Sequence, residues 1–315
     1  MEAGSTVSVE KRKLRPRLGG LGAGAQRVEA AVTQELHGER LDRTMAALWP
    51  DMSRTLARKI IGMGAVMVGQ KRCRVASRMV RTGDWITATW HAQTLQPESY
   101  PLEIKHEDTD LLVVSKPAGQ LVQGTELGDT GTLQRELEKR FGDDVRLLHR
   151  LDKPASGLMV ASRNKSASKG LTPQFREHTI RRVYWAICTG RPEEGPCEIP
   201  LQRWKRKMAV AQEGDEAALS AKTDVKVLDT QGEMSLVQAT LYTGRTHQIR
   251  VHLSALGAPI VGDRLYGGEP ASRLCLHAVV LGFTHPVTDE GLDFKQQPGA
   301  DFWDAGDFPP QGEDG

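Results

Sequence analysis

The sequence has few cysteines and no long apolar run. Its four cysteines, Cys73, Cys188, Cys197 and Cys275, form no Cys-x-x-Cys pair and lack the spacing of a structural zinc site. We therefore expect buried, unpaired thiols in a reducing compartment. The longest apolar runs, such as Leu111 to Val114, are far shorter than the ~20 residues of a membrane-spanning helix, which argues against a membrane protein.

A secretory signal is also missing. Residues 1–25 contain no apolar stretch of the ~7–15 residues that such a signal needs, so we expect a cytoplasmic protein. The basic run from Lys11 to Arg17 leaves import into an organelle as the alternative, although Glu2 and Glu10 are unusual in a transit peptide.

A strong net charge is the third absence. The formal net charge is only +2, so the overall field gives no argument for nucleic-acid binding and the local distribution has to decide. That distribution is uneven. The segment from Glu39 to Trp90 holds ten Lys and Arg against four Asp and Glu, whereas the chain after Pro286 holds one Lys against eight Asp and Glu. The length of 315 residues suits a large domain, a small domain and tails.

Helical and strand patterns predict a small α/β domain over residues 38–92. Residues 1–30 are rich in Gly, Ala and charge, and are predicted to form a mobile basic tail. Apolar residues at helical spacing predict one helix from Arg40, and Ser53 suits the N-cap of a second helix. Strands are predicted over residues 65–68, 72–75 and 85–90.

The small domain resembles the S-four RNA-binding module in the order of its residues. The matching residues are Leu41-Asp42, Ser53-Arg54, Ile60 with Gly64, Val66 with Val68, and Gly83-Asp84. Modules of this kind bind structured RNA through the basic face of their helix pair. The resemblance therefore implies RNA contacts by Arg54, Arg58 and Lys59. Gly69 stands where the family often has Asn before Gly, a departure that affects only the hairpin turn.

Short β-patterned runs predict an α+β domain over residues 103–295, built on a large, mainly antiparallel mixed sheet. These runs cover residues 111–115, 157–161, 182–188, 223–227, 236–240 and 276–280. Residues 93–102, with Pro97 and Pro101, are predicted to be the linker between the domains. Residues 296–315 are acidic and rich in Gly and Pro, which predicts a flexible tail.

One motif places a carboxylate among cations, in the run His149-Arg150-Leu151-Asp152-Lys153-Pro154-Ala155-Ser156-Gly157-Leu158. Arg150 and Lys153 favour the ionised form of Asp152, and the Ser-Gly pair permits a turn that leaves it on a loop beside the sheet. An aspartate flanked by basic residues is by itself more often a structural salt bridge than a reactive group.

The complete run resembles the central motif of RluA-type pseudouridine synthases. Further segments match the same family, namely Val113 to Gly119, Arg182 to Ala186 with Gly190, Thr243 to Leu253, Val261 to Gly267, and Leu276 to Ala278. Two residues depart from the family pattern, because Ala155 stands where Thr or Asp is common and Arg182 replaces the usual Lys. Neither departure removes a group that the reaction requires.

The resemblance implies a pseudouridine synthase fold and the isomerisation of uridine to pseudouridine in RNA. Asp152 would be the catalytic carboxylate, either as a nucleophile at C1′ or as a base at C2′. Tyr184 would lie against the flipped uracil and act in proton transfer at C5, and Arg245 would pair with Asp152. Arg150 would fill the space that the flipped base leaves.

The same resemblance places Lys116 and His149 among the substrate-binding residues, because both lie in matching segments. No cofactor is implied, since the reaction adds and removes nothing. The expected partner is RNA, with ribosomal RNA preferred and transfer RNA as the alternative, and the protein is expected to act as a monomer.

Two other functions compete with this one. A catalytically silent RNA-binding or ribosome-assembly protein could keep the fold without turnover. A metal-assisted hydrolase could use His247, His252 and His277, but the first two are five residues apart without the glutamate of a zincin motif. We therefore expect no metal.

Overall fold

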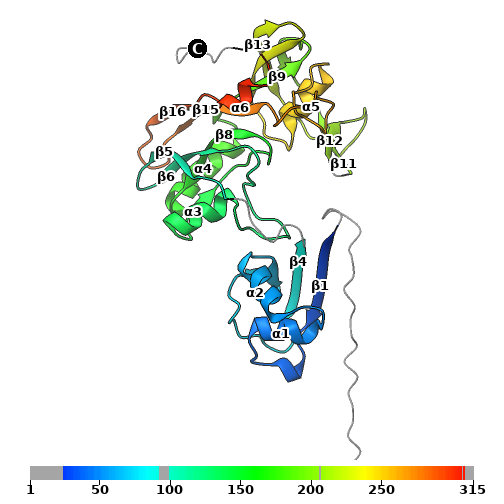
Figure 1. Cartoon of the computed structure of the whole chain (residues 1–315). Coiled ribbons are helices and arrows are strands. Elements are labelled where there is room, and N and C mark those ends of the chain that lie inside the picture. Colours follow the sequence, from blue (N-terminus) through cyan, green and yellow to red (C-terminus); the bar gives the residue numbers. More distant parts are fainter. Residues whose placement is uncertain (1–23, 92–98, 206, 307, 309–315) are drawn as a thin grey trace, which may run out of the picture. The chain divides into compact units, whose positions relative to one another are not determined.

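The computed structural model describes residues 24–91, 99–205, 207–306 and 308, which belong to two compact units (Figure 1). Met1–Ser99 and Gln123–Arg135 are assigned to the first unit, and Tyr100–Val122 and Glu136–Gly315 to the second. Most of the predicted basic tail, most of the predicted linker and the end of the predicted acidic tail lie outside the described residues. None of the helices in the described segments has the length and hydropathy that crossing a membrane requires.

The first unit contains a helix pair and a four-stranded antiparallel sheet in the order β1-β4-β2-β3. Its elements are β1 (Ala25–Ala31), η1 (Gln34–Leu36), α1 (Leu41–Leu48), α2 (Arg54–Gly62), β2 (Val66–Val68), β3 (Lys71–Cys73) and β4 (Trp85–His91). The Ser53 hydroxyl accepts a hydrogen bond from the Leu56 amide at 3.1 Å, which confirms the predicted N-cap of α2. The apolar faces of both helices meet the sheet in one core.

The prediction of a tail up to residue 30 is wrong for the part that forms β1. This strand pairs with β4 along its whole length, from Ala25 opposite His91 to Ala31 opposite Trp85. The sequence of β1 does not alternate apolar and polar residues, and only Ala25 and Val28 of this strand are buried. The strand is held mainly by backbone hydrogen bonds to its neighbour, which composition does not reveal.

The second unit is built on a ten-stranded sheet. Eight strands follow the order β10-β13-β14-β9-β15-β8-β6-β5, while β16 pairs with β15 and β7 pairs with β8. The pair β8 and β15 is parallel and the other pairs are antiparallel, which confirms the predicted mainly antiparallel mixed sheet. The strands are β5 (Glu103–Glu107), β6 (Leu111–Lys116), β7 (Arg146–Leu147), β8 (Ser156–Ser162), β9 (Arg181–Thr189), β10 (Gly195–Cys197), β13 (Thr223–Gln231), β14 (Met234–Leu241), β15 (Leu276–Thr284) and β16 (Gly291–Lys295).

Helices and a separate hairpin accompany this sheet. They are α3 (Leu133–Phe141), α4 (Lys165–Arg176), α5 (Gln248–Ala255), α6 (Ala300–Trp303) and the hairpin of β11 (Leu201–Trp204) with β12 (Lys207–Val210). Ala167 and Leu171 of α4 pack against Leu158 and Val160 of β8, in a core that fixes the start of this strand. All four cysteines are buried and free.

The predicted domain end at residue 295 is too early. Phe302 and Trp303 of α6 are buried, with the Phe302 ring centroid 6.4 Å from that of His277 and the Trp303 ring centroid 6.1 Å from that of Trp185. Phe308 is buried as well. The acidic composition of this segment predicted a flexible tail, but its three aromatic side chains are buried. The domain therefore includes α6.

Close packing of β8 on β15 fixes the loop that precedes β8. Gly157 has φ +118°, and a Cβ atom added there would lie 2.4 Å from the backbone of Ala278. Only glycine fits this approach. The loop between β7 and β8 carries Asp152, as the sequence predicted, and therefore enters the sheet along a fixed path.

Candidate active site

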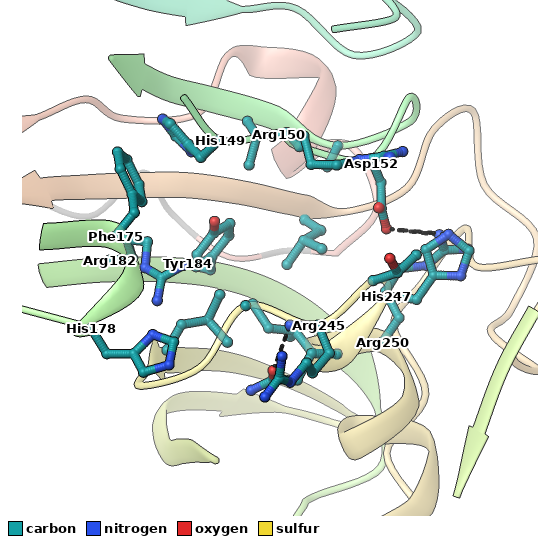
Figure 2. A pocket seen from close by; sticks show the side chains of 18 of the residues that line it. His149, Arg150, Asp152, Phe175, His178, Arg182, Tyr184, Arg245, His247 and Arg250 are labelled. Carbon is teal, nitrogen blue, oxygen red and sulfur yellow. Dashed lines mark hydrogen bonds and ion pairs between the residues drawn. The ribbon is translucent and has the colours of Figure 1, made fainter. Parts of the chain in front are cut away.

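One cavity in the second unit brings together residues from four segments of the chain. It has a volume of about 280 Å³, and its lining includes His149, Arg150, Asp152, Phe175, His178, Arg182, Tyr184, Arg245, His247 and Arg250. In Figure 2, Asp152 and Arg250 lie at one end, Phe175, His178 and Arg182 lie at the other, and Tyr184 lies between them. The cavity thus combines a carboxylate, an aromatic face and several cations.

Asp152 contacts its neighbours through one of its two carboxylate oxygens. Its side chain is 15% exposed, and Oδ2 accepts a hydrogen bond from Nη1 of Arg250 at 3.0 Å. The same oxygen lies 3.8 Å from Nε2 of His247. Within the described residues, Oδ1 has no hydrogen-bond partner. The carboxylate is therefore oriented by a cation while one oxygen remains available to the cavity.

Arg250 is itself fixed by a second carboxylate. Its Nε and Nη2 donate to Asp263 at 2.7 and 2.8 Å, and its guanidinium lies 5.0 Å from the ring centroid of Tyr266. Burial alone would lower the pKa of Arg250, but the hydrogen bonds to Asp263 and Asp152 outweigh burial and raise that pKa. Arg250 therefore stays charged and bridges two aspartates.

The expected pairing of Arg245 with Asp152 is wrong. Arg245 lines the cavity, but its Nε donates to the Ser220 carbonyl at 2.9 Å. The chain turns at His247, which has a left-handed φ of +55° at the start of α5, so Arg250 on that helix reaches Asp152 instead. Both arginines belong to one motif, and residue type alone did not distinguish them.

Tyr184 lines the middle of the cavity from β9. It is almost fully buried, and burial raises the pKa of its hydroxyl to about 12, although the charge of Arg182 opposes this shift. The hydroxyl is therefore protonated near neutral pH. The ring gives the cavity an aromatic face, which is a surface on which a base can stack.

His149 and Arg150 both line the cavity, but their environments differ. Nε2 of His149 accepts a hydrogen bond from the Val160 amide at 3.0 Å, and its ring is stacked on Phe175 at 4.8 Å between centroids. Burial, assisted by the charge of Arg182, lowers the pKa of His149 to about 3, so this wall of the cavity is neutral. Arg150 is exposed, so its side chain has room to move.

Lys116 does not line the cavity, which contradicts its expected role in binding substrate. It is fully buried, and Nζ donates to the carbonyls of Pro117 and Gln120 at 2.8 Å and of Lys153 at 3.1 Å. These three bonds use all the ammonium hydrogens. Lys116 therefore ties the end of β6 to the loop that carries Asp152. Burial lowers the pKa of Lys116 to about 7.

The three histidines considered as metal ligands lie in separate environments. Only His247 lines the cavity. His252 contacts the Thr223 hydroxyl at 3.0 Å and the Ile199 carbonyl at 2.9 Å. His277 contacts the Ser156 hydroxyl at 2.8 Å and the Gln296 carbonyl at 3.1 Å. Both ring nitrogens of the latter two histidines are therefore occupied by protein groups.

The first unit has an arginine cluster around a fully buried carboxylate, Asp42. Asp42 accepts hydrogen bonds from the Nε atoms of Arg40 at 3.0 Å, Arg54 at 2.9 Å and Arg58 at 2.8 Å. Burial alone would raise the pKa of Asp42, but these three guanidinium groups hold it well below its usual range. The side chains of Arg54 and Arg58 remain 42% and 53% exposed, and Lys59 is exposed beside them.

Sequence comparisons identify both units. The RNA pseudouridylate synthase family matches residues 110–255, and the S4 domain family matches residues 39–86. Ribosomal large subunit pseudouridine synthase D of Zymomonas mobilis is 33% identical over 297 residues, which cover 85% of this chain and 93% of that protein. An uncharacterized RNA pseudouridine synthase of Chloroflexus aurantiacus is 38% identical over 287 residues, covering 84% of this chain and 87% of that protein.

A solved structure agrees with these matches. Human RNA Pseudouridylate Synthase Domain Containing 1 superposes with a TM-score of 0.53 at 30% sequence identity, covering 64% of this chain and 85% of that one. The chain therefore belongs to the RluA family of RNA pseudouridine synthases, which isomerise uridine in RNA, and it carries an S4 domain N-terminal to its synthase domain.

Proposed function

We propose that this enzyme isomerises uridine in the RNA of the large ribosomal subunit, with Asp152 as its catalytic carboxylate. One observation carries the choice of Asp152, namely that it lies in the cavity with one oxygen on Arg250 and the other without a partner among the described residues. The choice of ribosomal RNA rests on the S4 domain and on the relatives named as large-subunit synthases.

The reaction breaks the bond from C1′ to N1 of uracil and forms a bond from C1′ to C5. The proton on C5 is lost and N1 gains one, so nothing is added overall. The Asp152 carboxylate serves either as nucleophile at C1′ or as base at C2′, and the hydrogen bond from Arg250 orients it in both cases.

The uridine has to leave its stack before Asp152 can reach it, which costs about a few kcal/mol. In the proposed complex, Arg150 occupies the vacated position in the RNA, because its exposed side chain lies at the cavity. Tyr184 stacks on the flipped uracil, and its hydroxyl oxygen takes up the proton from C5 while its own proton passes to solvent, from which N1 gains one. Arg245, half-buried in the same lining, contacts the phosphate of the flipped nucleotide.

Pseudouridine maps of total RNA test the proposal. Maps are compared between cells with and without the protein, and then after restoring either the wild type or Asp152→Asn. We expect one or a few sites in large-subunit ribosomal RNA to disappear and only the wild type to restore them. Unchanged maps would support a catalytically silent protein, and restoration by Asp152→Asn would exclude Asp152 as the catalytic group.

We further propose that the enzyme acts as a monomer in the cytoplasm. Light scattering of the purified chain measures its mass, and cell fractionation locates it. A stable dimer, or recovery in an organelle, would contradict this part of the proposal.

A further inference from the structure

Arg182 is a buried cation that lacks partners. It is 8% exposed on β9 and lines the cavity, yet Nε and Nη2 have no hydrogen-bond partner among the described residues. The described part of the chain also places no carboxylate oxygen within ion-pair distance of this guanidinium. A buried charge without a counter-charge is costly, so these donors indicate that a bound molecule supplies the acceptor.

The position of Arg182 points to the base of the nucleotide. Arg182 and Tyr184 are two residues apart on one strand, so their side chains share a face of the sheet. Figure 2 shows Tyr184 between Arg182 and Asp152 in the cavity. A nucleotide with its C1′ at Asp152 and its uracil on Tyr184 therefore directs the far edge of the base toward Arg182.

The backbone of Gly244 leaves room for this contact. A Cβ atom added to Gly244 would lie only 2.8 Å from Nη1 of Arg182, so no larger residue fits there without displacing the guanidinium. Gly244 itself lines the same cavity. The absence of a side chain at Gly244 therefore lets the main chain approach the guanidinium closely.

We propose that Arg182 donates hydrogen bonds to the O4 carbonyl oxygen of the flipped uracil and thereby selects uridine over cytidine. This inference rests on the proposed function of the cavity. In uracil, C4 lies across the ring from N1, so O4 is the oxygen farthest from the ribose. Cytosine has an amino donor at this position, and two sets of donors would then face each other.

The rotation of the base preserves the contact. Turning uracil by half a turn about the axis through N3 and C6 exchanges N1 with C5 and C2 with C4. O2 then takes the place of O4, so Arg182 meets a carbonyl oxygen before and after the rotation. A backbone phosphate is a poorer candidate, because the exposed Arg150 and the half-buried Arg245 line the same cavity and are more open to solvent than Arg182.

The test uses the full chain and synthetic RNA that carries uridine or 4-thiouridine at the position mapped in cells. Sulfur is a weak acceptor, so the thio substrate removes the proposed bond without changing the protein. Arg182→Met removes the donors at similar length, and Arg182→Lys keeps a charged donor. Single-turnover rates and RNA dissociation constants are measured for all combinations, and thermal unfolding checks that each variant folds.

We expect 4-thiouridine to slow the wild type on the order of 10- to 100-fold, and Arg182→Met to slow the uridine reaction by a similar factor. The two changes together should cost little more than one, because both remove the same bond. Arg182→Lys should be closer to the wild type. Dissociation constants should stay within about twofold, since phosphate contacts dominate RNA affinity.

Two results would overturn the inference. The first is equal wild-type rates on uridine and 4-thiouridine, a comparison that needs no variant to fold. The second is an undiminished thio effect in Arg182→Met together with weaker RNA binding, which would assign Arg182 to the backbone. A wild type that isomerises no uridine at all would instead contradict the proposed function itself.

Discussion

Asp42 in the first unit and Asp152 in the second are both aspartates with arginine partners, but their oxygens are used differently. Asp42 is fully buried, with Oδ1 bonded to Arg40 and Oδ2 shared by Arg40, Arg54 and Arg58. Asp152 is partly exposed to a cavity and is bonded through one oxygen to a single arginine. A basic neighbourhood is therefore common to both sites, and the unoccupied oxygen is what distinguishes the reactive candidate.

The largest difference in reaction rate should appear when the same isosteric change is made at each aspartate in turn. Asp152→Asn is expected to lower the single-turnover isomerisation rate by at least about 10³-fold, because it removes the charged oxygen, while RNA affinity stays within about twofold. Asp42→Asn should leave the rate from the bound state unchanged. A comparable loss of bound-state rate in Asp42→Asn would remove the distinction between the two carboxylates.

Arg250 and Arg245 provide the next comparison. Arg250→Ala leaves two aspartates without their shared cation and should lower the rate on the order of 10²-fold and destabilise the fold by about 3 kcal/mol. Arg245→Ala should cost less than Arg250→Ala in rate and about 0.5 kcal/mol or less in stability, because Arg245 is half-buried and bonds one carbonyl. Rates and thermal unfolding of both variants check the order, which the reverse ranking would contradict.

Acid should destabilise the second unit before the first. Burial lowers the pKa of His149 to about 3 and of His277 to about 4, against an ordinary value of 6.5. The unfolded chain therefore binds more protons than the folded one as the pH falls below about 6.5, and each such histidine removes up to about 1.4 kcal/mol of stability per pH unit. Asp42 has a lowered pKa, so its contribution is lost only near and below its ordinary value of 3.8.

Amide hydrogen exchange of the full chain at pH 7 and pH 5, corrected for intrinsic rates, measures the local stability of both units in one experiment. Amides of β8 and β15 should lose more protection than those of β2 and β4. His149→Gln keeps an acceptor for the Val160 amide without the titration, so it should reduce the acid loss. Equal losses in the two units would show that these histidines do not set the acid sensitivity.

The sequence predicted elements that have a periodic pattern or a capping residue, as α2 with Ser53 shows. It did not predict β1, because a strand held by backbone pairing needs few apolar residues. Lys116 looked like a substrate contact, although it ends a strand whose six residues are all buried. The direction in which each side chain points, as for Arg245 and Arg250, depends on turns that residue type does not encode.

The smallest effect concerns how Asp42 arranges the arginines of the S4 domain. Asp42→Asn removes a negative charge, which by itself would strengthen binding to RNA. Asparagine, however, offers one acceptor and two donors to three guanidinium groups, so Arg54 and Arg58 should lose their fixed positions. We expect RNA affinity to fall by about three- to tenfold, because the ordering of both arginines must then occur on binding.

The exposed Asp51 supplies a matched control in the same unit. Asp51→Asn makes the same change in net charge without touching the arginine cluster, so it should leave RNA affinity unchanged or slightly higher. Arg58→Ala should reduce the salt dependence of binding by about one phosphate contact. Affinities for the ribosomal RNA fragment that carries the mapped uridine are measured across a salt series. If both asparagine variants bind more tightly, charge alone governs this surface and Asp42 has no positioning role.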